Sequence, residues 1–169
     1  MSLIGFKAQN HKQQVNARGA KDAVDDRGTS PEVFGPLMER FAFTIDVAAS
    51  ENNTKCPKFY TKEDNGLEQS WMGERVWCNP PYSDCGAWVR KAWQEWVAGA
   101  ELIVMLLPAN RVEQSWWQDY VEPFRDRPGS ALKVEFLRGR MRFIRPNAVV
   151  SPKGDRPPFG VCLLIWERY

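Results

Sequence analysis

Long apolar segments are missing from this chain, and so is a recognisable secretion signal. No apolar stretch approaches the roughly 18 residues that a helix needs to cross a bilayer. Residues 1–19 hold only a four-residue apolar patch, which is too short for the hydrophobic segment of a signal peptide. We therefore expect a cytoplasmic protein with no membrane partner.

Metal ligands are also scarce. The chain has four cysteines and a single histidine, His11, and no two cysteines have the C-x-x-C spacing of a zinc site. We expect no bound metal, and reduced thiols are the default state of cytosolic cysteines. Cys78 ends a short apolar run, and we interpret it as a packed strand residue rather than as a nucleophile.

Charge and length are ordinary. The net charge of +2 is too small to indicate nucleic-acid binding by itself, so the positions of the charged residues must be considered. Residues 1–28 are polar and lack periodicity, which predicts a flexible N-terminal arm. Residues 29–169 have the length of a single domain, and a composition of 43% hydrophobic residues suffices for a core.

The most informative feature that is present is Asn79-Pro80-Pro81-Tyr82, which follows the apolar run and precedes a helix-like stretch. Two prolines donate no backbone hydrogen bonds and hold the chain extended, so this loop should be rigid. The Asn79 side-chain oxygen and the Pro80 carbonyl could accept the protons of an exocyclic amino group, while Tyr82 could stack on the ring. The loop therefore indicates a site for a flat heterocycle at the carboxyl end of a strand.

Apolar periodicity predicts alternating strands and helices. Ser30 or Thr29 should cap a helix that begins at Pro31, and Gly99 should end the helix that Ser83 or Asp84 caps. The uninterrupted apolar run 102–107 is typical of a strand buried on both faces. A further helix is expected at 112–121 and a polar loop at 50–70. The other expected strands are 43–47, 76–78, 131–137, 141–144 and 161–166. This order predicts a three-layer α/β fold with a mixed sheet.

These segments together resemble the DNA N-6-adenine methyltransferases of the phage and prophage Dam type. Ser30-Pro31 resembles the start of the motif that lies along bound S-adenosylmethionine, and residues 43–49 resemble the cofactor strand. The catalytic loop of the family matches Asn79 to Ser83. Residues 106–109 and 136–143 match two later segments of the family. The resemblance covers roughly residues 29–166 and implies an abbreviated Rossmann-like methyltransferase fold.

The chain departs from the usual cofactor strand, because Asp46 is followed by Val-Ala-Ala-Ser rather than by a glycine-rich turn. The resemblance implies that Asp46 and Ala48 contact the cofactor, with Asp64 as a candidate for its ribose. Only 32 residues lie between Asp46 and Asn79, so the sheet must be abbreviated or its strands reordered.

The resemblance implies methyl transfer from S-adenosylmethionine to the N6 amino group of adenine in DNA, with Asn79, Pro80, Pro81 and Tyr82 as the catalytic residues. In a duplex the base would be flipped into the pocket. Alternatives remain open. The same tetrapeptide serves enzymes that methylate protein glutamine, guanine amino groups of RNA or cytosine amino groups. A catalytically silent DNA-binding phage protein and a general α/β binding domain are further alternatives.

DNA contacts are predicted for an arginine row. In an extended strand, Arg138, Arg140 and Arg142 would share one face, and Arg145 follows them. Such a row could follow the phosphates, although a solvated strand face is the ordinary alternative. The eight tryptophans are interpreted mainly as core residues. Trp116 and Trp117 are adjacent, so one of them is expected to face away from the core.

Overall fold

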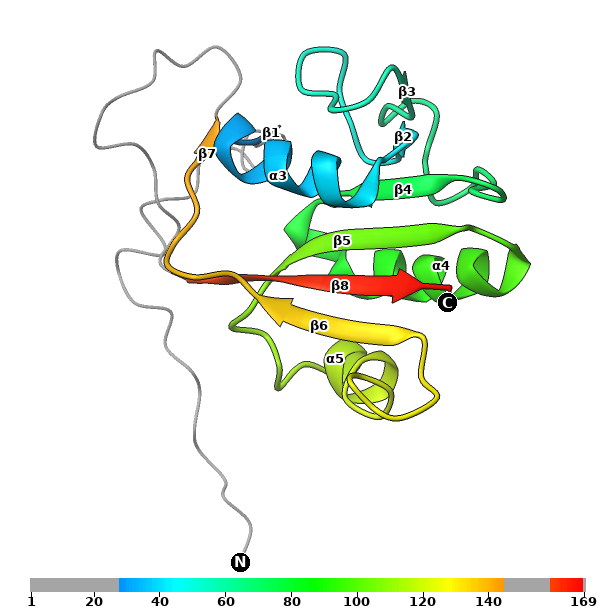
Figure 1. The fold of residues 1–169 in the computed structure, drawn as a ribbon, viewed down its shortest axis with the longest axis vertical. Coiled ribbons are helices and arrows are strands. Elements are labelled where there is room, and N and C mark those ends of the chain that lie inside the picture. The colour runs from blue at the N-terminus through cyan, green and yellow to red at the C-terminus, as the bar shows by residue number, and fades with distance from the viewer. Residues whose placement is uncertain (1–27, 145–158, 169) are drawn as a thin grey trace, which may run out of the picture.

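The computed structural model describes residues 28–144 and 159–168, and its centre is a six-stranded mixed sheet (Figure 1). From one edge to the other, the strands are β3 (Lys58–Phe59), β2 (Ile45–Asp46), β4 (Arg75–Cys78), β5 (Leu102–Pro108), β8 (Val161–Glu167) and β6 (Leu132–Phe136). The first four run parallel, and β8 is antiparallel to both of its neighbours. The predicted α/β class and the mixed sheet are confirmed.

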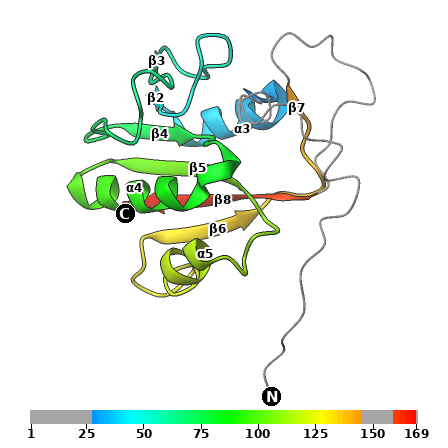
Figure 2. The same cartoon turned by 180° about the vertical axis from the view of Figure 1, so that it is seen from behind.

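Helices cover both faces of the sheet, which gives the three predicted layers (Figures 1 and 2). Helix α3 (Pro31–Phe41) packs on one face, and α4 (Cys85–Ala98) and α5 (Ser115–Tyr120) pack on the other. Strand β5 contributes alternate side chains to the two cores, and its seven residues are all buried. An uninterrupted apolar run is the pattern that such a strand requires, because both of its faces are covered.

Helix starts differ from the prediction in one respect. Ser30 and Asp84 occupy the N-cap positions of α3 and α4, but neither side chain makes a capping hydrogen bond. Before α4, a short 3-10 helix, η1 (Tyr82–Asp84), leads into the α-helix, and Asp84 has φ −135° and ψ 41° instead of the extended backbone of a usual cap. Gly99 ends α4 with a φ of +119°, as predicted.

Several elements are shorter than the sequence indicated. The strand expected at 43–47 is reduced to β2 at Ile45–Asp46, and the helix expected at 112–121 spans Ser115–Tyr120. The expected strand 141–144 is reduced to β7 (Phe143–Ile144), which lies outside the main sheet and pairs with β1 (Gly28–Thr29). Gly28 therefore lies in a strand, while the rest of the predicted N-terminal arm lies outside the described residues.

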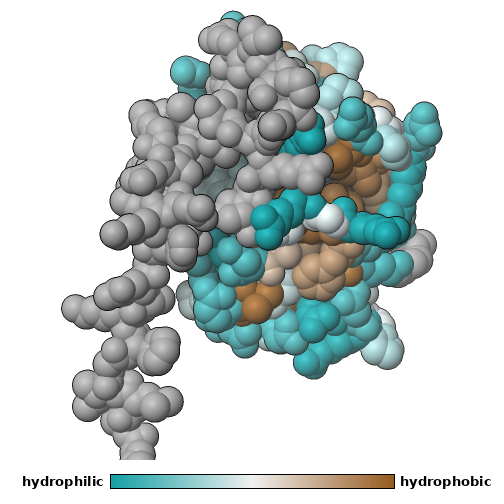
Figure 3. All heavy atoms as spheres, turned by 90° about the vertical axis from the view of Figure 1, so that its left-hand side faces the viewer, coloured by the Kyte–Doolittle hydropathy of each residue, from teal (hydrophilic) through white to brown (hydrophobic). Residues whose placement is uncertain are grey.

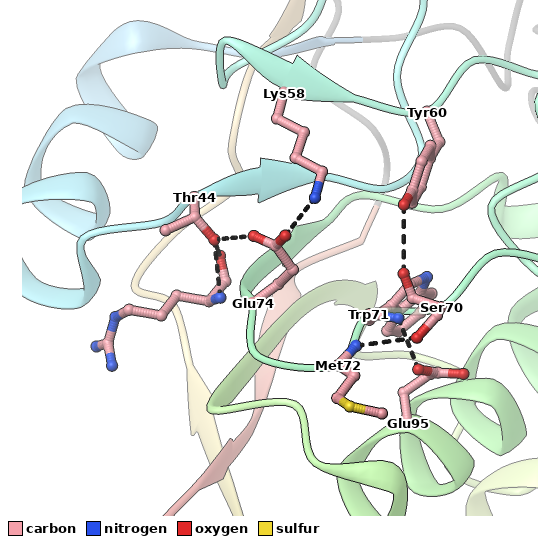
Figure 4. A network of polar contacts seen from close by, with 9 residues as sticks. Thr44, Lys58, Tyr60, Ser70, Trp71, Met72, Glu74 and Glu95 are labelled. Carbon is pink, nitrogen blue, oxygen red and sulfur yellow. Dashed lines mark hydrogen bonds and ion pairs between the residues drawn. The ribbon is translucent and has the colours of Figure 1, made fainter.

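The abbreviation of the sheet is visible between Asp46 and Asn79. Residues 47–74 contain β3 and turns but no helix, and β2 pairs directly with β4. Strand β3 was not predicted, because its two residues lie in a polar stretch without periodicity. A polar network attaches this long connection to the sheet and to α4 (Figure 4). Glu74 accepts hydrogen bonds from Thr44 and Lys58, and the Glu95 carboxylate of α4 accepts the Trp71 N–H at 2.7 Å.

The tryptophans are mostly core residues, as predicted, and six are buried: Trp71, Trp77, Trp88, Trp116, Trp117 and Trp166. The expectation for the adjacent pair was wrong, since Trp116 and Trp117 are 8% and 1% exposed. Both belong to the core that α4 and α5 cover, where Trp116 packs against Gly86 of α4. Within the described ranges, no helix has the length and apolarity needed to span a membrane.

Candidate active site

A cavity of about 960 Å³ opens where β2 and β4 end. Among the described residues, four stretches of chain form its walls: Gly28–Thr29 and residues within 46–55, 61–67 and 77–88. Figure 3 views the molecule from the side where these strands end, and apolar surface lies there between hydrophilic side chains. The carboxyl edge of parallel strands is the usual ligand-binding edge of an α/β sheet. The volume is within the range of pockets that bind small molecules.

Asp46 is the buried charge of this cavity. The residue is 3% exposed, and its carboxyl group accepts hydrogen bonds from the Lys55 N–H at 3.0 Å and the Ala48 N–H at 3.3 Å. Burial raises the pKa of Asp46 to about 6, and the two backbone donors oppose that rise. Ala48, the other residue predicted from the cofactor strand, also lines the cavity. The turn that follows β2 thus brings an acidic group and small side chains to the cavity wall.

Two buried hydroxyl groups in the cavity wall have no partner among the described residues. They are Thr29 Oγ1 and Ser50 Oγ. Thr29 is placed by β1, whose pairing with β7 sets it opposite Phe143, and it is only 1% exposed. An unsatisfied buried polar group typically costs 1–3 kcal/mol. Both residues line the cavity, and hydroxyl groups without a partner are suited to binding polar atoms of a ligand.

Gly66 allows the loop after β3 to approach the turn that follows Asp46, a turn that itself contains no glycine. A Cβ on Gly66 would lie 2.1 Å from the Val47 carbonyl oxygen and 3.1 Å from the Trp88 ring. Only glycine lets the loop after β3 pack this tightly on the turn after β2. The Trp71 indole N–H donates to the Gly66 carbonyl at 3.0 Å and holds the loop in place. The glycine beside the turn after β2 therefore comes from a different segment of the chain, and its position was not predicted from the sequence.

The Asn79 loop borders the cavity at the end of β4. Asn79 and Pro81 line the cavity, whereas Pro80 is buried and does not. Tyr82 is also outside the lining: its ring packs edge-on against Phe143, with centroids 6.0 Å apart. The Tyr82 hydroxyl is buried without a partner among the described residues, and burial raises its pKa well above the ordinary value. The hydroxyl therefore stays protonated at neutral pH and is not a base.

The remaining predicted cofactor residues lie beside the cavity. Ser30 and Pro31 follow the two lining residues of β1 but are not themselves part of the wall. Asp64 is exposed, and its carboxylate accepts hydrogen bonds from the Thr61 N–H at 2.8 Å and the Thr61 hydroxyl at 2.9 Å. These hydrogen bonds lower the pKa of Asp64. This geometry favours the interpretation of Asp64 as a loop carboxylate that stabilises its own turn.

The predicted arginine row does not lie on a strand. Arg138, Arg140 and Arg142 fall in the irregular segment between β6 and β7, so the extended geometry assumed for them was wrong. All three side chains are nevertheless exposed, while Met141 and Phe143 are buried. Gly139, with a φ of +76°, turns the chain here and interrupts the strand. Arg145 lies outside the described residues.

The cysteines have the structural role predicted for Cys78. All four are buried with free thiols, and burial raises the pKa of Cys78 well above its ordinary value. A protonated, buried thiol is a poor nucleophile. Three further residues that line the cavity were not predicted as site residues: Thr29, Ser50 and Gly66. Thr29 directly precedes the recognised Ser30-Pro31, and this proximity was the one available signal.

Comparison with known proteins relates the chain to DNA methyltransferases of phages. A family model described as DNA N-6-adenine-methyltransferase (Dam) matches residues 17–169. A DNA N-6-adenine-methyltransferase of Escherichia phage T1 is 40% identical over 101 residues, which cover 58% of this chain and 42% of that protein. A protein of the same name from Haemophilus phage HP1 is 42% identical over 65 residues, 38% of each chain. The putative methyltransferase YfdM of Escherichia coli is 32% identical over 74 residues, 39% of this chain and 80% of that protein. The chain thus spans less than half the length of the two phage relatives.

Proposed function

Because the chain belongs to the DNA N-6-adenine-methyltransferase (Dam) family, we propose that it transfers a methyl group from S-adenosylmethionine to the exocyclic N6 amino group of adenine in DNA. The observation that carries this proposal is the shared cavity of Asp46 and Asn79. A group that can hold a donor and a group that can hold an amino acceptor border the same space. Transfer between two bound molecules requires that arrangement.

The residues present fit S-adenosylmethionine. Its ammonium and hydroxyl groups match the Asp46 carboxylate, and its polar atoms could satisfy the Thr29 and Ser50 hydroxyl groups. Ala48 presents only a small side chain to the cavity, and Gly66 lets the loop after β3 pack closely on the turn that carries Ala48. When bound, this cofactor supplies a methyl group that its sulfonium already activates. The protein then has to hold the two partners in register rather than generate a strong nucleophile.

Asn79 is the residue that we assign to the acceptor. Its side-chain oxygen, together with the Pro80 carbonyl, would accept the two protons of the adenine amino group. Those hydrogen bonds draw the nitrogen toward tetrahedral geometry and localise its lone pair for attack. Tyr82 ends the same loop, and its ring packs on Phe143 outside the cavity wall. Because the residue is partly exposed there, we assign its ring to stacking on the flipped base.

We assign contacts with the DNA backbone to the exposed arginines between β6 and β7. Arg138 and Arg140 follow the end of edge strand β6, on the carboxyl side of the sheet where the cavity opens. Phe136, which ends that strand, is 58% exposed and adds an apolar contact surface. Cationic side chains beside a base pocket are suited to phosphate contacts that position the duplex.

The test is to incubate the protein with radiolabelled S-adenosylmethionine and separate pools of DNA, RNA and protein, with Asn79→Ala as the control. Label should enter DNA, and nucleoside analysis should find it in N6-methyladenine. Label in RNA or in protein glutamine would assign the activity to another amino or amide acceptor. If DNA is bound but no pool is labelled, a silent DNA-binding protein would replace the enzyme.

A further inference from the structure

Arg111 connects the strand end of β5 to the loop that carries Asn79. It lies in the turn after β5, and its guanidinium donates a hydrogen bond from Nη1 to the Tyr82 carbonyl oxygen. The same Nη1 lies 4.0 Å from the Cys85 sulfur at the first residue of α4. Arg111 is partly buried in this position. A single side chain thus contacts the end of the Asn79 loop and the start of the helix that follows.

The loop needs such an external contact because of its own composition. Pro80 and Pro81 have no N–H, so this part of the chain cannot donate backbone hydrogen bonds. Its carbonyl groups do accept hydrogen bonds. The Pro81 carbonyl accepts the Asp84 N–H at 3.1 Å, and the Cys85 thiol donates to the Tyr82 carbonyl at 3.5 Å. A thiol is a weak donor, whereas a hydrogen bond from a charged guanidinium is roughly twice as strong as one between neutral groups.

We propose that Arg111 is a positioning residue that sets the conformation of the loop from Asn79 to Tyr82 through the Tyr82 carbonyl. This inference rests on the proposed function, since the loop holds the acceptor amino group there. Arg111 itself does not line the cavity. Its removal should therefore change the turnover of bound substrates and leave the cofactor site intact.

The chain offers a matched control in Arg168. Its guanidinium also donates to backbone carbonyls, those of Trp96 and Ala100, but these lie at the other end of α4. Arg111→Ala and Arg168→Ala therefore remove the same kind of interaction from opposite ends of one helix. Both are expected to lower the thermal stability, and only the first is expected to affect the loop.

The first measurement is hydrogen exchange, which does not depend on catalysis. The amides of the peptide 79–86 should exchange at least fivefold faster in Arg111→Ala than in the wild type and should be unaffected in Arg168→Ala. Arg111→Lys retains a cationic donor and should restore part of the protection. Unchanged exchange in folded Arg111→Ala would overturn the proposal, whether or not the protein proves to be a methyltransferase.

The second measurement is steady-state methylation of DNA. Arg111→Ala should lower kcat by roughly 10- to 100-fold, the range expected from a misplacement of about 1 Å, with the dissociation constant of S-adenosylmethionine changed less than twofold. Millimolar guanidinium ion should restore part of kcat in Arg111→Ala but not in Asn79→Ala. A loss confined to KM for DNA, with a reduced salt dependence, would instead make Arg111 a phosphate contact and overturn the positioning role. Absence of methylation by the wild type would refute the proposed function and leave the exchange result to decide on Arg111.

Discussion

At the scale of single residues, Asn79 is expected to act on the acceptor of the methyl group and not on its donor. It borders the cavity at the end of β4, whereas Asp46 borders it at the end of β2. Asn79→Ala should lower the methylation rate by at least tenfold, because the amino protons of adenine lose an acceptor. Calorimetry should find the affinity for S-adenosylmethionine nearly unchanged. A variant that keeps more than a tenth of the wild-type turnover would contradict the role assigned to Asn79.

Asp46 should make the stability of the protein depend on pH. Burial raises its pKa from an ordinary 3.8 to about 6, so the folded state binds a proton more tightly than the unfolded state. Stability from this group is therefore present below about pH 4 and is lost as the pH rises to about 6. The shift corresponds to about 3 kcal/mol. Urea unfolding at pH 4 and pH 7 should therefore show that the stability of the wild type falls relative to that of Asp46→Asn as the pH rises.

The same variant tests the cofactor site. Asn cannot carry the negative charge, so Asp46→Asn should weaken S-adenosylmethionine binding at pH 7 even if it stabilises the apo protein. Buried functional groups often show this exchange of stability for activity. Unaltered affinity in calorimetry would move the donor site away from the turn after β2.

At the scale of elements, the contact between the loop after β3 and the turn after β2 depends on Gly66. Gly66→Ala places a Cβ 2.1 Å from the Val47 carbonyl, so the loop must move. The expected cost is about 1–3 kcal/mol of unfolding free energy, together with weaker cofactor binding. Gly35→Ala in α3 is the control, because its Cβ meets nothing within 4 Å and alanine favours a helix. Equal stability of Gly66→Ala and the wild type in urea would contradict this packing argument.

The segment between β6 and β7 should determine the salt dependence of DNA binding. Its arginines are exposed on an irregular segment, so their charges can follow phosphates without strand geometry. Replacing Arg140 and Arg142 by glutamine should weaken binding to all DNA sequences alike. The slope of log K against log salt should fall by roughly one to two units, while cofactor affinity stays constant. A folded double variant with an unchanged slope would assign these residues to an ordinary solvated surface.

At the scale of the whole molecule, one sheet joins the two hydrophobic cores. Alternate residues of β5 and β8 enter opposite cores, so neither core can be lost while the other keeps its strands. The predicted single domain should therefore unfold in one cooperative transition. Trp77 lies in one core, and the other buried tryptophans lie in the second: Trp71, Trp88, Trp116, Trp117 and Trp166. Tryptophan fluorescence and far-ultraviolet circular dichroism should give coincident urea curves, and separated midpoints would show two units.

The sequence by itself determined the features that local periodicity or chain stiffness controls. The apolar run of β5 predicted a strand buried on both faces, and Gly99 predicted the end of α4. The Asn79 tetrapeptide indicated a rigid loop at a strand end, because proline restricts the backbone whatever surrounds it. The order of these segments was enough to predict the α/β class and to identify the family resemblance.

Tertiary structure alone decided which distant residues meet. Thr29 reaches the cavity through the pairing of β1 with β7, and Gly66 reaches Val47 across a loop without periodicity. The turn at Gly139 keeps the predicted arginine row from forming a strand. The Asp64 carboxylate accepts a hydrogen bond from Thr61 in its own turn and does not line the cavity. Such outcomes depend on contacts between residues far apart in the chain, for which neither helical nor strand periodicity carries a signal. The position and stiffness of the loop could therefore be predicted from the sequence, whereas the shape of the cavity that it borders could not.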